Sequence, residues 1–568
     1  MQRVVDVQNL KVIEVDDLSP PPNRIHAEVL VVGGGLGGVA AALAASQAGR
    51  TVCLVEETDW LGGQATSQGV SALDENNWIE TSGGTRSYLA FRTAIRDWYR
   101  RNTKLKPEAA RNERLNPGNG WVSRLCFEPK AALAVIDDWL GPFAKSGHLR
   151  ILKRCKAWAV GVQGFRVTYV DLVNLESGER FRATADYVID ATELGDLLAL
   201  GAADFVTGAE PREWTGEPAA IDTYDPEDVQ SFTYPFAIEY RPGERHVIAK
   251  PPGYDQNVTL QPYTLVVQYA RGPRTYGMFK RAEDTYGPFW TYRRLIDAGQ
   301  FDDPRYPHDI AMINWPGNDY RHGNILVPSP EEQIQYLRAA KDLSLGLLYW
   351  LQHEVERDDG GKGYPEFKLR PDVMGTADGL SMFPYIRESR RILALKTIVE
   401  QEVATDGVRA VHFADSVGIG RYGIDIHESK RNRKQVISPA KPFQIPLGAL
   451  IPKVMRNLLA GCKNIGTTHI TNGCYRLHPI EWNIGESAGD LAAFCIEQSC
   501  TPHDVRARPE LLLALQRRLV RRGVPLMWYD DVPVNDPRFE KVQMLPFEQP
   551  EVLARLDKDM HAPQVTDK

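Results

Sequence analysis

Residues 27–67 read AEVLVVGGGLGGVAAALAASQAGRTVCLVEETDWLGGQATS, and this stretch decides the fold. It contains a short apolar run, residues 29–32, of the kind that a buried parallel strand shows. A glycine cluster follows, and residues 39–48 are alanine-rich, which favours a helix. A second apolar run, residues 51–55, ends at Glu56. The stretch therefore predicts a strand, a tight turn, a helix and a second strand.

The glycines of the turn indicate a ligand. Gly33, Gly35 and Gly38 have the spacing G-x-G-x-x-G. In this motif the first glycine permits the turn, the second lets backbone approach a pyrophosphate, and the third lets the helix pack on the strand. The helix start presents N–H groups and a positive dipole end to phosphates. Glu56 follows at about 20 residues, where an acid can bind a ribose hydroxyl. We therefore predict a dinucleotide site; the alternative is a glycine-rich turn in an ordinary βαβ unit.

Three further stretches carry a resemblance to a known family. Gly62 and Gly63 follow the acid closely, and residues 187–196 (YVIDATELGD) are an apolar run that ends in Ala-Thr and a glycine. Residues 457–489 contain NLLAG, THI, an arginine and GESAG in that order. Together they resemble the FAD-dependent oxidoreductases of the glutathione reductase and fumarate reductase flavoprotein superfamily, which implies FAD as the cofactor. Glu486 departs from the pattern, because a neutral residue is expected there.

The resemblance implies an α/β protein with a Rossmann-like FAD-binding domain of glutathione-reductase type and an inserted α+β substrate or cap domain. We place the first part of the FAD-binding domain at residues 25–202 and its second part at residues 381–500. The cap is placed at residues 203–380, which resemble neither nucleotide half and hold many aromatics and prolines. Residues 501–568 are a C-terminal extension. A flavoprotein would hold its substrate at the interface that such an insertion creates.

Hydrophobic periodicity predicts further elements. Residues 1–24 are expected to be an extended lead-in, and a helix is expected to begin at Ile484. Further helices are predicted at residues 86–101, 128–139, 331–357 and 510–521, and strands at residues 150–160, 164–173, 180–189 and 265–269. A second G-x-G-x-x-G within residues 418–423 is followed by the strand-like residues 424–427, so it does not predict a second nucleotide site.

The bulk composition excludes several classes of function. The chain of 568 residues is too long for one simple core, and its 43% hydrophobic and 25% charged residues rule out global disorder. A net charge of −7 without a Lys/Arg block argues against a nucleic-acid partner. Seven cysteines without a C-x-x-C pair argue against a dithiol redox centre, and no metal site is predicted. The N-terminal residues show no apolar signal core, and nowhere do about 18 apolar residues follow one another. We therefore expect a cytoplasmic protein with no membrane span.

The predicted cofactor contacts come from both ends of the nucleotide fold. A helix N-terminus at residues 485–487 is expected to face the flavin, where N–H dipoles would stabilise negative charge at N1 and the C2 carbonyl. Glu486 would oppose this unless it turns away or is protonated. The residues that we predict to contact FAD are Gly33, Gly35, Leu36, Gly37, Gly38, Glu56, Glu57, Gly62, Gly63, Gln64, Ala191, Thr192, Gly195, Asn464, Gly485, Glu486 and Ser487.

Three residues of the C-terminal segment are candidates for the reaction with substrate. His469 and His478 carry imidazoles, which suit the removal of a hydroxyl or amine proton. Arg476 would bind a substrate carboxylate or a developing oxyanion. The alternative for each histidine is a structural role, bonded to backbone in a loop. Tyr422 and His427 are secondary candidates.

Residues 382–392, MFPYIRESRRI, contain Arg387, Arg390 and Arg391. Guanidinium groups bind phosphate or carboxylate through paired hydrogen bonds. Arginines that tie domains together or remain solvated would give the same pattern. The sequence is therefore compatible with an anion-binding role and with a structural role for these arginines.

These patterns predict an enzyme, an FAD-dependent dehydrogenase or oxidase. We expect it to oxidise a small polar substrate (an amine, amino acid or hydroxy compound) by hydride transfer to flavin N5. One alternative is a flavin monooxygenase or halogenase, less favoured because no NAD(P)H-linked motif is seen; another is a flavin electron-transfer subunit without its own small-molecule turnover. The expected partners are the substrate and an electron acceptor such as oxygen, a quinone or a redox protein, with a homodimer left open.

Overall fold

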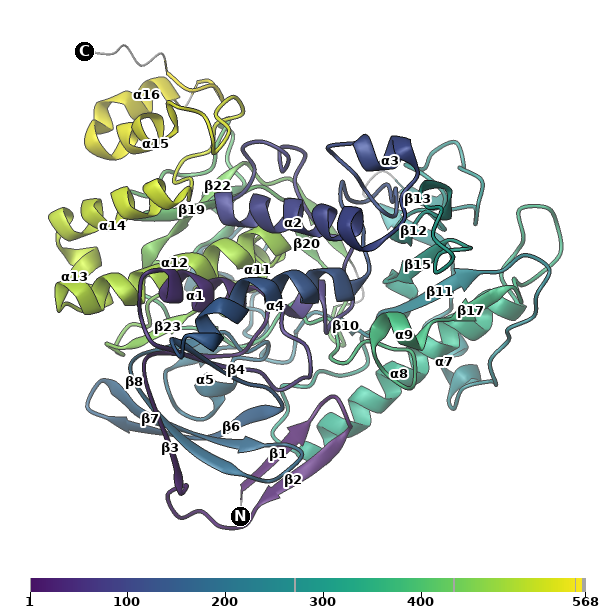
Figure 1. The fold of residues 1–568 in the computed structure, drawn as a ribbon, viewed down its shortest axis with the longest axis horizontal. Coiled ribbons are helices and arrows are strands. Elements are labelled where there is room, and N and C mark those ends of the chain that lie inside the picture. Colours follow the sequence, from purple (N-terminus) through teal and green to yellow (C-terminus); the bar gives the residue numbers. More distant parts are fainter. Residues whose placement is uncertain (1, 270–271, 433–434, 557, 564–568) are drawn as a thin grey trace.

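A seven-stranded sheet forms the centre of the fold (Figure 1). The structure, a computed structural model, describes residues 2–269, 272–432, 435–556 and 558–563. Parallel strands follow the spatial order β5 (Leu149–Leu152), β4 (Val52–Val55), β3 (Asn23–Val32) and β8 (Arg180–Asp190), and β23 (Leu458–Ala460) also pairs with β8. β7 (Arg166–Asn174) and β6 (Cys155–Gln163) extend the sheet from β8 as antiparallel strands. The predicted α/β fold with a parallel-strand sheet is confirmed.

Helices cover the apolar strands. α1 (Leu36–Gln47) contacts β3, β4 and β8, and it also packs on α4 (Pro129–Lys145) and α12 (His478–Gln498). α2 (Arg86–Asn102) lies against α4. Residues 29–32 are buried, as expected for a parallel strand that is covered on both faces. One large hydrophobic cluster joins these elements.

A second hydrophobic cluster surrounds an antiparallel sheet in the middle of the chain. Its strands follow the order β14 (Arg294–Ile296), β15 (Ile310–Ile313), β11 (Phe236–Tyr240) and β17 (Phe367–Leu369). The long helix α8 (Pro330–His353) packs its apolar stripe into the same cluster. Ser329 caps α8 by accepting a hydrogen bond from the Glu332 N–H, and Pro330 is at the first helical position. The helix predicted at residues 331–357 is therefore confirmed, with an earlier end.

Two predictions for the N-terminal half were wrong. Residues 1–24 were expected to be an extended lead-in, but β1 (Gln2–Asp6) and β2 (Lys11–Val15) form a hairpin beside α8. The strand predicted at residues 150–160 is two strands, β5 and β6, which pair with different neighbours. Arg154 separates them with a φ of +54°, and its guanidinium donates to Asp6 at 2.5 Å and to the Glu57 carbonyl at 2.7 Å. These contacts involve residues distant in sequence, so local periodicity did not reveal them.

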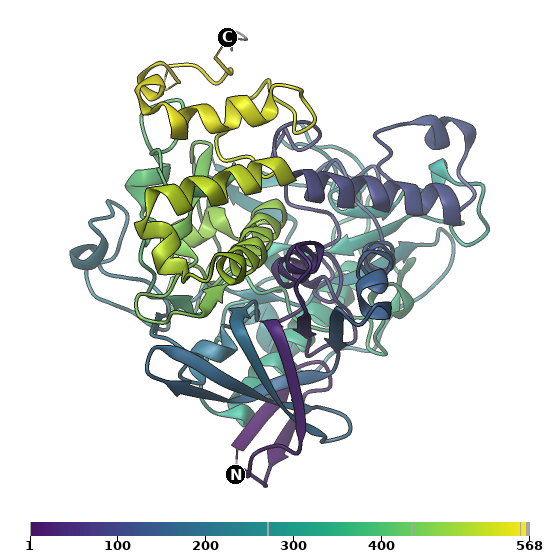
Figure 2. The ribbon, with the colours of Figure 1, turned by 60° about the vertical axis from the view of Figure 1, so that its left-hand side comes forward.

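The C-terminal helices lie at the end of the molecule opposite the N-terminal hairpin (Figures 1 and 2). They are α13 (Pro502–Ala507), α14 (Pro509–Arg522), α15 (Phe539–Glu548) and α16 (Leu553–Leu556), and α14 confirms the helix predicted at residues 510–521. The remaining elements are α3 (Pro107–Arg111), α5 (Asp196–Ala199), α6 (Arg212–Thr215), α7 (Tyr254–Leu260), α9 (Pro371–Met374), α10 (Glu400–Val403), α11 (His469–Tyr475), β9 (Phe205–Val206), β10 (Phe232–Thr233), β12 (Val266–Tyr269), β13 (Gly272–Thr275), β16 (Asp319–Tyr320), β18 (Arg391–Ile392), β19 (Ser416–Gly420), β20 (Ile424–Ile426), β21 (Val436–Ser438) and β22 (Phe443–Pro446). Across the described ranges, no helix combines the length and apolar character needed to span a bilayer.

Candidate functional site

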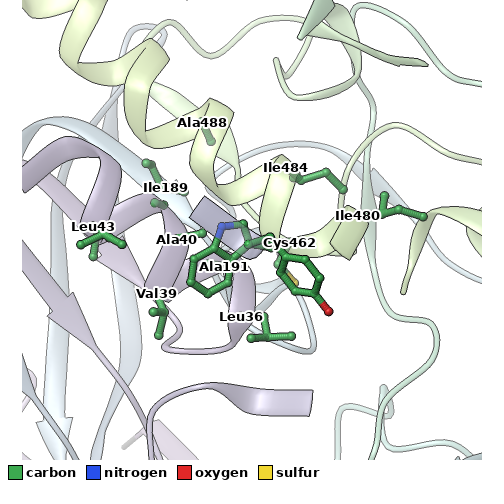
Figure 3. Packing of buried hydrophobic residues seen from close by; sticks show 14 of the residues in the cluster. Leu36, Val39, Ala40, Leu43, Ile189, Ala191, Cys462, Ile480, Ile484 and Ala488 are labelled. Atoms are coloured by element: carbon green, nitrogen blue, oxygen red, sulfur yellow. The ribbon is translucent and has the colours of Figure 1, made fainter. Parts of the chain in front are cut away.

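Two helices from opposite ends of the chain, α1 and α12, pack side by side. Figure 3 shows apolar side chains of both, such as Ala40 and Ile484, within one hydrophobic cluster. The helices run in the same direction, because Gly485 lies against Gly37 and, one turn further, Gly489 lies against Ala41. A Cβ atom on Gly485 would lie 1.9 Å from the Gly37 carbonyl oxygen, so the contact requires glycine. Both N-termini, with their positive dipole ends, therefore lie at the same end of the pair.

The predicted start of the second helix was wrong. α12 begins at His478, well before Ile484, and Pro479 stands in its first turn, where proline is favoured. Residues 485–487 are consequently inside the helix. Glu486 accepts a hydrogen bond from the Ser87 hydroxyl at 2.6 Å, and Ser487 donates to the Val417 carbonyl at 2.7 Å. These contacts pack α12 against neighbouring elements. The N-terminal end of α12 lies in the turn that follows Leu477.

A groove lies where β3, β4 and β8 end, next to the N-terminus of α1. Seven of the predicted cofactor residues line it: Gly33, Gly35, Glu56, Glu57, Gly63, Ala191 and Thr192. Others support its walls: Gly38 approaches the Gly33 carbonyl, Asn464 donates to the Asp190 carbonyl at 2.9 Å, and Gly195 lies against Arg390. Leu36, Gly37, Gly62 and Gln64 are buried beside the groove.

Buried acids surround the N-terminus of α1. Glu56 accepts hydrogen bonds from the Gly34 N–H at 2.7 Å and from the Thr58 hydroxyl at 2.6 Å, and burial raises the pKa of its carboxyl group. Glu481, in the first turn of α12, accepts from the Gly37 N–H at 3.1 Å. The Glu481 carboxylate thus connects the N-terminal turns of α1 and α12.

Lys463 balances the charge of two of these acids. Its ammonium group binds Glu193 and lies 3.2 Å from Glu481. Burial would raise the pKa of Glu481, but the Lys463 charge together with hydrogen bonds from Gly37 and Gln64 outweighs burial, and the pKa is lowered. For Glu193 burial dominates and raises the pKa to about 7. Glu193 can therefore be neutral near an anionic ligand at neutral pH.

The groove fits the predicted FAD by two tests of its residues. A Cβ atom on Gly35 would lie 2.6 Å from Glu193 Oε1, so glycine keeps the backbone open at the helix start. Glu193 Oε1 and Gln68 Nε2 are buried atoms of groove-lining residues and have no hydrogen-bond partner within the described structure. A polar ligand in the groove would complete their hydrogen bonding.

A second cavity of about 810 Å³ shares a wall with the groove. Phe383 lines the groove, whereas Tyr385 and Arg387, two and four residues further on, line the second cavity. Gln64 donates to the carbonyl of Arg476 at 3.0 Å, and Arg476 also lines the second cavity. The N-terminus of α12 and residues 383–387 therefore separate the two spaces.

The second cavity is lined by charged or titratable side chains and by aromatic ones. Its charged residues are Asp74, Arg293, Arg387, Asp425, His427 and Arg476, and its aromatic residues are Trp121, Tyr292, Trp315, Tyr385 and Tyr422. They come from both hydrophobic clusters and their connecting segments. Four lining residues were predicted from the sequence as site residues: Arg387, Arg476, Tyr422 and His427. Asp74 and Arg293 were not predicted, because they stand in no motif.

His427 lies between two acids at the edge of this cavity. Its Nδ1 is 2.6 Å from Asp319 Oδ2, and its Nε2 is 3.3 Å from Asp425 Oδ2. Burial would raise the pKa of Asp319, but Arg387 and His427 lower it to about 2. When Nδ1 carries the imidazole proton, it donates to the ionised Asp319, which orients the ring and leaves Nε2 as the proton-accepting nitrogen.

The structure does not bring the three predicted catalytic residues together. His478 is fully buried, with Nδ1 accepting from the Asp74 N–H and Nε2 donating to the Val70 carbonyl, and burial lowers its pKa to about 4. His469 lines a different cavity. Although burial opposes its charge, Glu388 raises the pKa of His469 to about 9. Of the three, Arg476 lines the cavity beside the groove.

The arginines of residues 382–392 fall into two groups: one lines a cavity, and two hold segments of the chain together. Arg387 lines the second cavity. Arg390 donates to the Leu194 carbonyl at 2.7 Å, and Arg391 binds Glu388 and Glu210 in the interior. These two arginines tie segments together, and Arg387 is placed to meet a ligand.

Comparison with known proteins shows a family match over most of the chain. Residues 28–519 match the profile of a family described as FAD dependent oxidoreductase. A search of curated proteins found no match. The family profile covers the groove, the α1–α12 pair and the second cavity.

Many solved structures are similar to this chain, including these three. The E. coli quinol fumarate reductase FrdA has 10% identity over 88% of this chain and 74% of that chain, with a TM-score of 0.36. A geranylgeranyl bacteriochlorophyll reductase-like protein from Thermoplasma acidophilum has 12% identity over 94% and 99%, with a TM-score of 0.29. L-proline dehydrogenase from P. horikoshii has 18% identity, but the match spans only 33% of this chain and 24% of that chain, with a TM-score of 0.17. At TM-scores this low, the likenesses carry no conclusion about activity.

Proposed function

The chain belongs to the FAD dependent oxidoreductase family, and on that premise we propose that it oxidises a small polar substrate by hydride transfer to N5 of FAD. When bound, FAD supplies the hydride acceptor. The observation that supports the proposal most directly is the wall shared by the nucleotide groove and the second cavity. A substrate in that cavity would be next to the cofactor site, yet held by a separate set of side chains.

The groove residues have distinct roles in this proposal. Gly33 and Gly35 let the backbone approach the pyrophosphate, and Glu56 binds a ribose hydroxyl. The first turn of α12, beginning at His478, takes the role first assigned to residues 485–487. The positive end of its dipole would stabilise the negative charge that hydride transfer creates.

We propose that residues 203–380 form a substrate cap inserted into a nucleotide domain of glutathione-reductase type. They contribute Arg293, Asn314 and Trp315 to the second cavity, whereas Tyr422 and Arg476 come from the other side. Enclosure between these two parts excludes water from the reacting groups. Electrons would then pass to oxygen or another acceptor.

Two groups in the cavity are assigned to orientation and proton handling. Arg476 is fixed by Tyr385 at 2.9 Å and by the Asp425 carboxylate at 3.2 Å, so its guanidinium has a defined orientation toward substrate. His427 is the single imidazole among the described lining residues, and an imidazole can act as a general base. The proton that leaves the oxidised substrate would pass to Nε2 of His427, while Nδ1–H stays hydrogen-bonded to Asp319 and the Asp425 carboxylate pairs with the imidazolium formed.

Anaerobic titration of the purified yellow protein tests the proposal. Amino acids, hydroxy acids, amines and sugars are added without oxygen, and the flavin absorbance is followed. At least one class should bleach the flavin, and admission of oxygen or an artificial acceptor should restore the colour. If dithionite bleaches the flavin and none of the compounds does, the proposed substrate oxidation is contradicted.

A further inference from the structure

Three buried arginines of the second cavity each have an N–H group whose hydrogen bond no group of the described structure accepts. The Nε atoms of Arg293, Arg387 and Arg476 are buried without a hydrogen-bond partner within the described structure. The three residues are only 6%, 3% and 2% exposed, respectively. A buried donor of this kind costs folding free energy unless a ligand accepts its hydrogen bond.

The other nitrogens of these arginines hold them in place. Arg293 donates to Asp74 at 2.9 Å, and Arg387 donates to Asp319 at 2.9 Å. Arg476 is fixed by its bonds to Tyr385 and Asp425. The acids therefore engage terminal guanidinium nitrogens, and no group of the described structure accepts from the Nε–H groups. A ligand would meet rigid donors, which reduces the entropy cost of binding.

The unsatisfied groups are all of one kind. Among the described residues that line the cavity, every buried side-chain atom without a partner is a guanidinium N–H donor, and none is an acceptor. Three arginines and the two acids Asp74 and Asp425 line the cavity, and the acid that pairs with Arg387, Asp319, is not a lining residue. A neutral sugar brings donors and acceptors in similar number, whereas a carboxylate brings acceptors alone.

Three aromatic rings among the lining residues suit the body of a small organic molecule, and we call Trp121, Tyr292 and Trp315 the aromatic wall. Trp121 and Tyr292 have ring centroids 4.6 Å apart, and Tyr292 and Trp315 have centroids 5.6 Å apart. Such a wall offers apolar contact with little loss of side-chain freedom. The cavity thus combines guanidinium donors with apolar ring surface.

We propose that the substrate is an organic carboxylate, whose charged group accepts hydrogen bonds from Arg293, Arg387 and Arg476 and whose body lies against the aromatic wall. This inference rests on the proposed function, since it assigns the substrate class to the same cavity. Guanidinium groups are the side chains best matched to a carboxylate, because they donate in pairs and stay charged.

Binding of benzoate and benzamide to the FAD-loaded enzyme tests the inference. Both probes present the same ring to the aromatic wall, and only benzoate carries a carboxylate. Calorimetry and the perturbation of flavin absorbance should both give benzoate at least about tenfold tighter binding, as expected for charge-assisted hydrogen bonds. Arg476→Gln should remove most of this preference, and Arg476→Lys should restore part of it.

Arg390→Gln is the matched control, because Arg390 belongs to the same segment as Arg387 but donates to the Leu194 carbonyl and does not line the cavity. It should keep the benzoate preference. Retention of the yellow colour shows that each variant is folded around its cofactor. Equal affinity for the two probes, or a preference unchanged in Arg476→Gln, would overturn the inference.

The two proposals fail in different ways. If neutral alcohols or sugars bleach the flavin and carboxylates neither bleach it nor bind, substrate oxidation stands and the carboxylate assignment is wrong. If benzoate binds selectively through Arg476 but no compound bleaches the flavin, the cavity does bind carboxylates and the oxidation is wrong.

Discussion

Gly35 is the residue on which cofactor retention depends most directly. A Cβ atom there would lie 2.6 Å from Glu193 Oε1 and 3.2 Å from Glu481 Oε1, at the start of α1. We therefore expect Gly35→Val to fold but to be purified without FAD. The ratio of flavin to protein absorbance measures retention, and circular dichroism checks the fold.

Gly141→Ala is the control for this substitution, since nothing lies within 4 Å of the added Cβ in α4. It should retain FAD fully. A yellow Gly35→Val protein with the wild-type flavin ratio would show that the backbone at this position does not approach the cofactor.

Asp190, at the end of β8, makes stability depend on pH. Burial raises its pKa from 3.8 to about 7. Between those values the folded protein keeps the proton and the unfolded chain loses it, so the free energy of unfolding falls as pH rises, by up to about 1.4 kcal/mol per pH unit. Asp190→Asn should remove this contribution. Urea unfolding of both proteins at several pH values between 4 and 7 measures the difference, and parallel curves would refute it.

The two histidines that line cavities can be separated by kinetics. His427 lies in the cavity beside the groove, whereas His469 lines another cavity and is held charged by Glu388. We expect His427→Gln to slow flavin reduction by about 100-fold or more without loss of FAD, as for removal of a proton-transfer group. His469→Gln should keep the reduction rate within about threefold. Stopped-flow reduction measures both, and the reverse ranking would return the role to His469.

At this scale the sequence predicted glycines and acids of the groove but few residues of the second cavity. Gly33, Gly35 and Glu56 stand in a motif whose spacing has a physical meaning. Arg293 and Asp74 meet at 2.9 Å although they are far apart in the chain. No local pattern predicts such a pair, because residues 203–380 and the FAD-binding fold must first come together.

At the scale of elements, the α1–α12 pair is the most constrained contact. A Cβ atom on Gly485 would lie 1.9 Å from the carbonyl oxygen of Gly37, and backbone cannot yield as a flexible side chain does. We expect Gly485→Ala to lower the free energy of unfolding by about 2 kcal/mol or more, within the range for overpacked interiors. Urea unfolding measures this, with Gly141→Ala as the helix-glycine control. An unchanged midpoint would mean that the helices can separate without cost.

Element types were easier to predict than element limits. The apolar strand and alanine-rich helix of residues 29–48 formed as expected, and so did α8 and α14. The start of α12 was misplaced because GESAG was given more weight than Pro479, the better helix-start signal. The hairpin β1–β2 was missed because it packs on α8, a contact that local pattern does not show.

At the scale of the whole molecule, FAD would join two ends of the chain. The groove is formed by the loop after β3 and the loop after β8, and Glu481 of α12 contacts the same helix start. The second hydrophobic cluster, with α8, contributes no residue to the groove apart from Phe383 at its edge. Removal of FAD should therefore weaken one part of the molecule more than the other.

Hydrogen exchange measured by mass spectrometry on the FAD-loaded and FAD-free protein tests this asymmetry. A ligand that binds only the folded state stabilises it by about 2.7 kcal/mol at 100 times its Kd, so opening of the segments that it holds becomes easier when it leaves. We expect exchange to increase in α1, in residues 61–70 and in the first turns of α12, and to stay nearly constant in α8. Equal increases in α1 and α8 would show that the two clusters open as one unit. An increase confined to α8 would contradict the placement of FAD between the two ends of the chain.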